Sequence, residues 1–123
     1  MRIYIESNSL FTYPDLTIFC EPIKLYNNRT DTAINPVVII EVLSKSTQDY
    51  DRGSKFKLYR GVPSLREYIL ISSTEVLIEK YIKQTDHKWQ FTAYNKGEES
   101  FAIEAIRLAI EVNSLYRGVT FEE

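Results

Sequence analysis

The apolar positions along the chain predict strands more often than helices. Residues 37–43 read Val-Val-Ile-Ile-Glu-Val-Leu, and a β-branched run this apolar is typical of a central strand covered on both faces of its sheet. Short apolar or alternating stretches predict further strands over residues 2–5, 10–13, 16–20, 67–72 and 100–103, and a hairpin of 75–82 with 89–94. We expect 10–13 and 16–20 to pair with each other as a hairpin.

One main helix is predicted at about residues 48–60. Ser44, Ser46 and Thr47 offer capping hydroxyls before it, and Gly61 stands just past its end, where glycine is favoured. Residues 21–35 have no hydrophobic periodicity and predict a loop, whereas residues 111–116 predict a short terminal helix. The expected fold class is therefore α/β or α+β: one domain over residues 1–123, with a mixed sheet of about six strands and one main helix.

The composition limits the kinds of site that the chain can form. Hydrophobic residues are 44% and charged residues 26%, as in ordinary globular domains. The longest apolar run, 36–43, is interrupted by Glu41 and is far shorter than the ~18 residues of a membrane span. One cysteine and one histidine exclude an internal disulfide and a Cys/His zinc site and argue against a Ser-His-Asp triad. We expect a cytoplasmic protein without membrane contact, whose metal chemistry would use oxygen ligands suited to Mg²⁺ or Mn²⁺.

The charge is unevenly distributed. The whole chain carries −2, but residues 45–66 contain six basic residues against two acids, which makes this segment +4. One interpretation is a face that attracts phosphate groups beside an acidic site. The alternative is a solvated amphipathic helix.

Glu41 is the clearest anomaly of the sequence. A carboxylate in the middle of a buried strand is costly unless it is compensated, and alternation places Glu41 on the same face as Val37, Ile39 and Leu43. It is either a metal ligand or catalytic carboxylate, or it is paired with a basic residue or faces water at an edge. Asp15 begins the strand after Pro14. It either ends a turn or joins Glu41 in a two-carboxylate metal site.

Lys55 lies on the predicted helix with Asp51 and Tyr59 on the same face, at spacings of four residues. It either forms a helix-stabilising pair with Asp51 or is held over the carboxylates, where it could orient water or stabilise negative charge. Lys57 faces elsewhere and is the weaker candidate.

These residues carry a resemblance to a known family. The matching segments are residues 13–18, 35–47, 50–60 and 62–68. Together they resemble the PD-(D/E)XK nuclease superfamily and, more specifically, its Uma-type putative restriction endonuclease family. The resemblance implies a restriction-endonuclease-like fold in which Asp15, Glu41 and the backbone carbonyl of Val42 bind the metal. The superfamily's usual lysine position is Leu43 here, so the resemblance points to Lys55 of the following helix instead.

The resemblance also sets the functional expectations. It implies a Mg²⁺- or Mn²⁺-dependent DNA endonuclease that hydrolyses phosphodiester bonds, with Asp15, Glu41 and Lys55 as catalytic residues. Members of the family usually begin with additional residues, including a helix pair. We therefore expect an N-terminally truncated domain whose bare sheet face is covered by homodimerisation. The alternatives are a catalytically inactive structural or interaction module and a DNA-binding relic of a nuclease that does not cleave.

Overall fold

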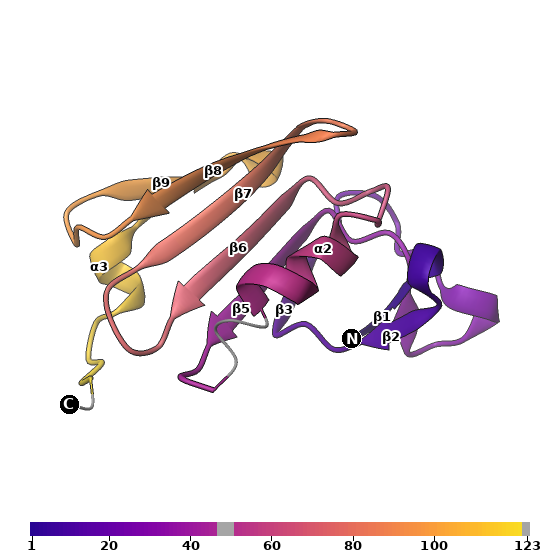
Figure 1. Ribbon diagram of the computed structural model, residues 1–123, viewed down its shortest axis with the longest axis horizontal. Helices are drawn as coiled ribbons and strands as arrows, with labels where there is room; N and C mark the ends of the chain where they lie inside the picture. The colour runs from indigo at the N-terminus through magenta and orange to yellow at the C-terminus, as the bar shows by residue number, and fades with distance from the viewer. Residues whose placement is uncertain (47–50, 122–123) are drawn as a thin grey trace.

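A five-stranded mixed sheet forms the centre of the computed structural model, which describes residues 1–46 and 51–121 (Figure 1). The strand order is β3-β5-β6-β7-β8. β5 and β6 are parallel, and the other neighbouring pairs are antiparallel. The strands are β3 (Leu16–Ile18), β5 (Val38–Leu43), β6 (Glu67–Ser72), β7 (Ile78–Thr85) and β8 (Lys88–Tyr94).

Two smaller sheets and a few short helices complete the described part. The first small sheet has the order β2-β1-β4, and in the second β9 pairs with β10. Their strands are β1 (Arg2–Ile5), β2 (Leu10–Thr12), β4 (Thr32–Ala33), β9 (Ser100–Ile103) and β10 (Leu108–Glu111). The helices are η1 (Glu6–Asn8), η2 (Tyr26–Asn28), η3 (Asp51–Lys55), α2 (Phe56–Tyr59), η4 (Glu104–Ile106) and α3 (Val112–Leu115). The mixed α and β class is confirmed.

The main helix lies where the sequence predicts it, but its winding differs. Residues 51–55 form a π-helix, η3, which continues as the α-helical turn α2. Residues 48–50, at the predicted start, lie outside the described residues. The helix ends before Gly61, as predicted, and a Cβ at this position would collide with the side chain of Ser7. A residue without a side chain at this position therefore lets the turn after β1 approach the end of the helix closely.

The predicted hairpin of residues 10–13 and 16–20 is wrong. β2 pairs with β1, and β3 pairs with β5 in the central sheet. A tight hairpin turn favours residues with positive φ, which Pro14 cannot adopt. Ser9, with φ of 49°, supplies that conformation between β1 and β2 instead. The segment through Pro14 therefore carries the chain from one sheet to the next.

Two short strands do not follow from the sequence pattern. Thr32 and Ala33 form β4 within the predicted loop, and both are fully buried where they pair with β1. β10 follows the turn η4, where Arg107 adopts a positive φ of 53°. Two to four residues are too few to show an alternating period. The predicted terminal helix is present but shorter, as α3.

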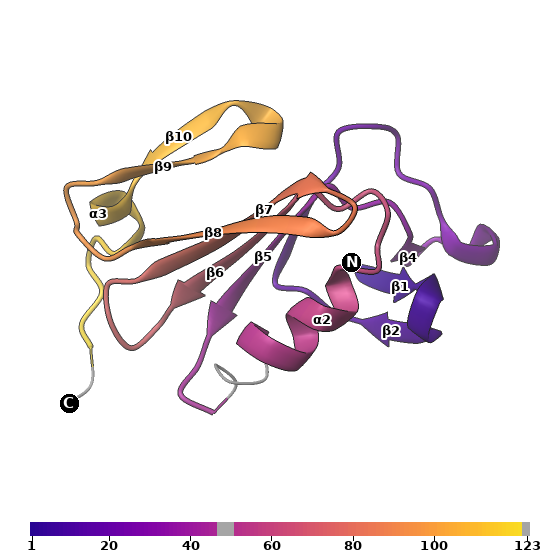
Figure 2. The ribbon, with the colours of Figure 1, turned by 45° about the horizontal axis from the view of Figure 1, so that its top comes forward.

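The core has two parts, one on each face of the central sheet. Ile39, Leu43 and Leu70 pack with the helix on one face, and Ile40 and Ile69 pack under β9 and α3 on the other. Figure 2 shows α2 on one side of the sheet and β9, β10 and α3 on the opposite side. The prediction that the strand at 37–43 is covered on both faces is confirmed.

Buried charges attach the β9–β10 sheet to the central one. Glu67, which is 1% exposed, accepts hydrogen bonds from the backbone N–H groups of Glu104 and Ala105 at 3.1 and 2.6 Å. The Lys80 ammonium donates to the carbonyl oxygen of Ala102 at 2.7 Å and lies 3.7 Å from the Glu67 carboxylate. These contacts neutralise both buried charges. Within the ranges 1–46 and 51–121, no helix is long and apolar enough to cross a membrane.

Candidate functional site

Glu41 lies in the interior, beneath the helix. Its side chain is 3% exposed, and its neighbours along the strand on the same face, Ile39 and Leu43, belong to the core. The Lys55 ammonium donates a 2.6 Å hydrogen bond to Glu41 Oε2. The sequence left open whether Glu41 is a ligand or an ion-pair partner, and the structure shows that it does form an ion pair with Lys55.

A buried tyrosine adds a second contact to Glu41. Tyr59 is fully buried, and its hydroxyl lies 3.3 Å from Glu41 Oε1 and 3.0 Å from Thr12 Oγ1. Lys55 and Tyr59 therefore approach the same carboxylate from one face of the helix, as their spacing predicts. The alternative pairing of Lys55 with Asp51 involves a side chain outside the described part of the chain.

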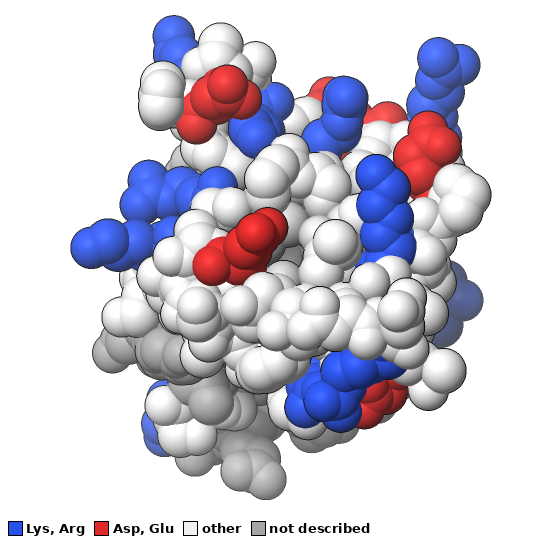
Figure 3. Space-filling model, turned by 90° about the vertical axis from the view of Figure 1, so that its right-hand side faces the viewer, with Lys and Arg blue, Asp and Glu red and all other residues white. Residues whose placement is uncertain are grey.

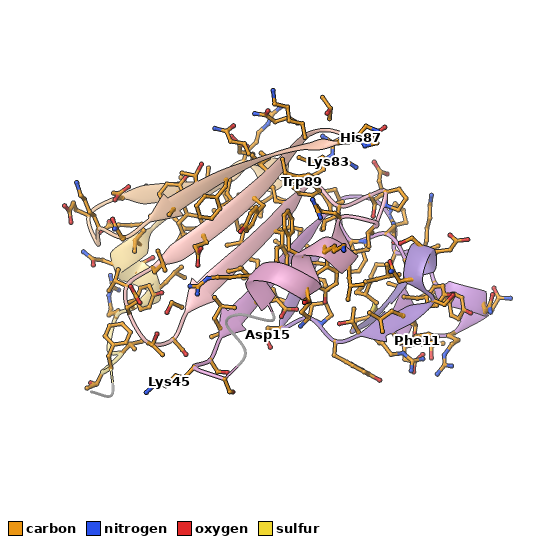
Figure 4. All side chains as sticks on the ribbon, in the orientation of Figure 1. Phe11, Asp15, Lys45, Lys83, His87 and Trp89 are labelled. Atoms are coloured by element: carbon orange, nitrogen blue, oxygen red, sulfur yellow. The ribbon has the colours of Figure 1, made fainter. Side chains whose placement is uncertain are left out.

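Asp15 lies beside β5, next to Glu41. The antiparallel register of β3 with β5 ends at the pair of Leu16 with Ile40, and Asp15 comes directly before Leu16. Asp15 is exposed, and its Oδ2 accepts a 2.8 Å hydrogen bond from the Val42 amide. The structure thus brings Asp15 to the edge of β5 beside Glu41, and Figure 4 labels Asp15 just below the helix in that view.

Val42 presents its backbone to the same place. In an antiparallel ladder the N–H and C=O of one residue face the same neighbouring strand. Because the Val42 N–H points to Asp15, its carbonyl faces the Asp15 side as well. The Val42 side chain points to the other face of the sheet and is 51% exposed.

A second ion pair docks the helix, and sequence reasoning missed it. Arg52 Nε lies 2.6 Å from Glu79 Oε1. Glu79 stands opposite Leu70, which in turn stands beside Glu41, so the two acids lie in one row across three strands. Arg52 and Lys55, three residues apart, bind the two ends of this row. Only the register of β5, β6 and β7 reveals the match.

Aromatic packing fixes the helix between these ion pairs. The Phe56 ring lies 4.1 Å from that of Tyr81, 5.4 Å from Tyr68 and 5.4 Å from Trp89, measured between centroids. Such pairs contribute about 0.5–1.5 kcal/mol each beyond their buried area. Burial raises the pKa of Tyr81, and the nearby charge of Glu79 raises it further. This cluster places Lys55 over Glu41.

Two of the six basic residues in the segment 45–66 are engaged in these ion pairs. Arg52 and Lys55 both form ion pairs with acids of the sheet, so fewer of its cations point to solvent than the sequence suggests. Figure 3 shows Lys and Arg side chains on several parts of one end of the molecule, with Asp and Glu between them. Among the residues that the structure describes, no three His, Cys, Asp or Glu side chains form a cluster that could hold a metal ion.

The geometry is that of an α+β domain in which Asp15 lies beside β5 and Lys55 of the helix pairs with Glu41 of the same strand. The family model described as "Uma2: Putative restriction endonuclease" matches residues 1–114. The chain belongs to this family, which confirms the resemblance to the Uma-type putative restriction endonuclease family.

Relatives and a solved structure agree with this assignment. The chain is 36% identical over 121 residues to the uncharacterized protein slr1290 of Synechocystis sp., covering 98% of this chain and 62% of that protein. It is 37% identical over 92 residues to sll1609 of the same organism, covering 75% of this chain and 52% of that protein. The chain thus spans between about half and three-fifths of these relatives.

The fold matches a crystal structure of a putative nuclease belonging to DUF820 from Anabaena variabilis. The TM-score is 0.73 at 16% identity, and the match covers 97% of this chain and 66% of that one. At this identity the similarity concerns the fold, which confirms the nuclease-like fold class.

Proposed function

We propose that this chain carries the active site of a Mg²⁺- or Mn²⁺-dependent DNA endonuclease of the PD-(D/E)XK type. The observation that carries the proposal is the convergence of Asp15, Glu41 and Lys55. Asp15 accepts a hydrogen bond from the amide of Val42, the residue after Glu41. Lys55 lies 2.6 Å from Glu41. The proposed catalytic unit is a single nuclease-like domain.

The donor groups fit a hard divalent ion in chemical type. Asp15 and Glu41 offer carboxylate oxygens, and Val42 offers a carbonyl on the same side. Such oxygens are the ligands that Mg²⁺ and Mn²⁺ prefer, with water completing the shell. Restriction endonucleases generally use divalent metals, which supports the same choice. When bound, such an ion activates water and stabilises negative charge on the scissile phosphate.

The protein's own residues have separate roles in this proposal. Lys55 keeps a positive charge at the Glu41 carboxylate, where it can donate to a phosphate oxygen or hold the attacking water. Tyr59, fully buried, fixes the orientation of Glu41 from its other oxygen. Asp15 remains exposed and accessible to DNA, while its bond to the Val42 amide holds it at the strand edge.

A second candidate is a nuclease relic that binds DNA or another partner without cleaving it. The observation in its favour is the Lys55–Glu41 pair, because the ammonium already neutralises the acid that would hold the metal. The two candidates differ in metal binding, since the relic needs none.

Cleavage of supercoiled plasmid with Mg²⁺ or Mn²⁺ tests the main proposal. We expect nicked and linear products from the wild type, and losses of at least about a hundredfold in Asp15→Asn, Glu41→Gln and Lys55→Met. Lys96→Met, which changes an exposed lysine between β8 and β9 without touching the site, should retain activity. Chelation of the metal with EDTA should abolish plasmid cleavage by the wild type. Equal activity in Glu41→Gln, or activity that persists in EDTA, would contradict the proposal.

The location and the assembly of the chain belong to the proposal as well. We place the protein in the cytoplasm and propose a homodimer. Leu16 and Val42 lie on the same face of the sheet at its β3 edge and are 52% and 51% exposed, which leaves apolar surface for a second copy. Light scattering should give twice the mass of one chain, and a monomeric mass would rule the dimer out.

A further inference from the structure

A basic surface surrounds the tip of the β7–β8 hairpin and is separate from the candidate site. Two clefts flank this tip. One has a volume of about 390 Å³ and is lined by Lys57, Arg60, Gly61, Asp86, His87 and Trp89. The other has about 300 Å³ and includes Arg66, Lys83 and the same Asp86 in its lining. We call the two clefts together the hairpin-tip surface.

The hairpin-tip surface is positive although the chain is acidic. Its lining holds four Lys or Arg residues against the single acid Asp86, in a chain whose net charge is −2. Asp86 is itself partly neutralised, because the Lys83 ammonium lies 3.8 Å from its carboxylate. Arg52 and Lys55 are engaged with acids of the sheet, whereas Lys57, Arg60 and Arg66 are exposed. The excess charge of the 45–66 segment therefore reaches solvent at this surface.

The surface is rigidly attached to the helix that bears Lys55. The Arg60 guanidinium lies 5.2 Å from the centroid of the Phe56 ring, and Phe56 also contacts Trp89 edge-to-face at 5.4 Å. Arg60 comes five positions after Lys55, a rise of about 8 Å along the helix. In Figure 4, α2 lies between Asp15 on one side and Lys83, His87 and Trp89 on the other.

We infer that the hairpin-tip surface binds the phosphate backbone of DNA whose neighbouring phosphodiester lies at the candidate site. The partner is a duplex polyanion because exposed Lys and Arg side chains, spread over two adjoining clefts, match a line of phosphates rather than one compact anion. The choice of DNA rests on the proposed function. The contacts are to the backbone, so they supply affinity and position but no sequence preference.

The salt dependence of DNA binding tests this inference. Fluorescence anisotropy would follow a short labelled duplex in EDTA, without cleavage, from about 50 to 200 mM salt. The test variant is Lys57→Gln/Arg66→Gln, which removes one exposed cation from each cleft. The matched control, Lys96→Gln/Arg117→Gln, removes an exposed lysine that follows β8 and an exposed arginine that follows α3.

The test variant should bind at least about tenfold more weakly than the wild type, with a salt slope smaller by about 2. The control should bind like the wild type. Arg60→Gln serves as a second variant if the first loses its fold by circular dichroism, and its slope should fall by about 1. Unchanged slopes in folded test variants, an equal loss in the control, or no binding by the wild type would each overturn the inference.

The outcome is separable from that of the proposed function. If the wild type cleaves DNA but the hairpin-tip variants bind normally, the inference fails and the nuclease proposal stands. If binding depends on Lys57 and Arg66 but no metal-dependent cleavage occurs, the hairpin-tip surface stands and the nuclease proposal fails.

Discussion

Replacing Lys55 with methionine should move stability and metal affinity in opposite directions. Methionine keeps much of the length and the helix propensity of lysine but removes the ammonium that contacts Glu41. The Lys55 side chain is 16% exposed, the Glu41 side chain is 3% exposed, and Lys55 Nζ lies 2.6 Å from Glu41 Oε2. Removing one partner of a pair this buried costs on the order of 3 kcal/mol. Urea unfolding should therefore shift to a midpoint lower by about 1–2 M.

Metal affinity should rise in the same variant. The ammonium and the ion compete for the Glu41 carboxylate, or repel each other if both are present. A hydrogen bond to a charged group contributes about 1.5–3 kcal/mol, so Lys55→Met should bind Mn²⁺ roughly ten- to a hundredfold more tightly. DNA cleavage should nevertheless fall, because the charge that assists at the phosphate is gone.

Calorimetry with Mn²⁺ and urea unfolding followed by circular dichroism measure the two quantities. Lys57→Met, two residues along the helix and exposed, should change neither. A folded Lys55→Met protein that binds Mn²⁺ no better than the wild type would refute the reasoning. In that case Glu41 is not a metal ligand, and its pair with Lys55 serves the fold.

Other contacts give further predictions. Glu79→Gln and Arg52→Met should each lower the free energy of unfolding by about 1–3 kcal/mol, and the double variant should lose less than the sum in urea titrations because they share one bond. Burial raises the pKa of Tyr116, so the contribution of its protonated hydroxyl to stability is complete below the ordinary pKa of about 10 and is lost as the pH rises through the folded value. As the pH rises above about 10, stability should fall more steeply in the wild type than in Tyr116→Phe. The hydrogen bond from Arg29 lowers the pKa of Asp31 to about 2. The small contribution of the ionised Asp31 carboxylate to stability is therefore present above about pH 4 and is lost as the pH falls towards 2. An NMR titration of Asp31 should give that low midpoint, and Arg29→Gln should restore a value near the ordinary one of about 3.9.

The sequence predicted the parts of the fold that depend on local pattern. The apolar run around Glu41 was long enough to indicate a central strand, and the helix signals that follow it placed Lys55 correctly. The anomaly of Glu41 was informative for the same reason. A carboxylate on the core face of a buried strand must have a partner, and the structure supplies Lys55.

The pattern of residue types along the sequence could not predict which distant strands and side chains pair with each other. Pro14 between two short apolar stretches suggested a turn, but which strands pair depends on long-range packing that no local period encodes. The Arg52–Glu79 pair has the same origin, because it follows from a register across three strands. The π-helical winding of residues 51–55 also has no signature in the residue types.

Manganese binding by calorimetry tests the central claim most directly. We predict one site in the wild type, with affinity reduced at least about tenfold in Asp15→Asn and in Glu41→Gln. Asp86→Asn, which removes an exposed carboxylate at the hairpin tip, should bind as the wild type does. The absence of binding by the wild type, or equal binding by all three variants, would contradict the two-carboxylate site and with it the proposed nuclease activity of this chain.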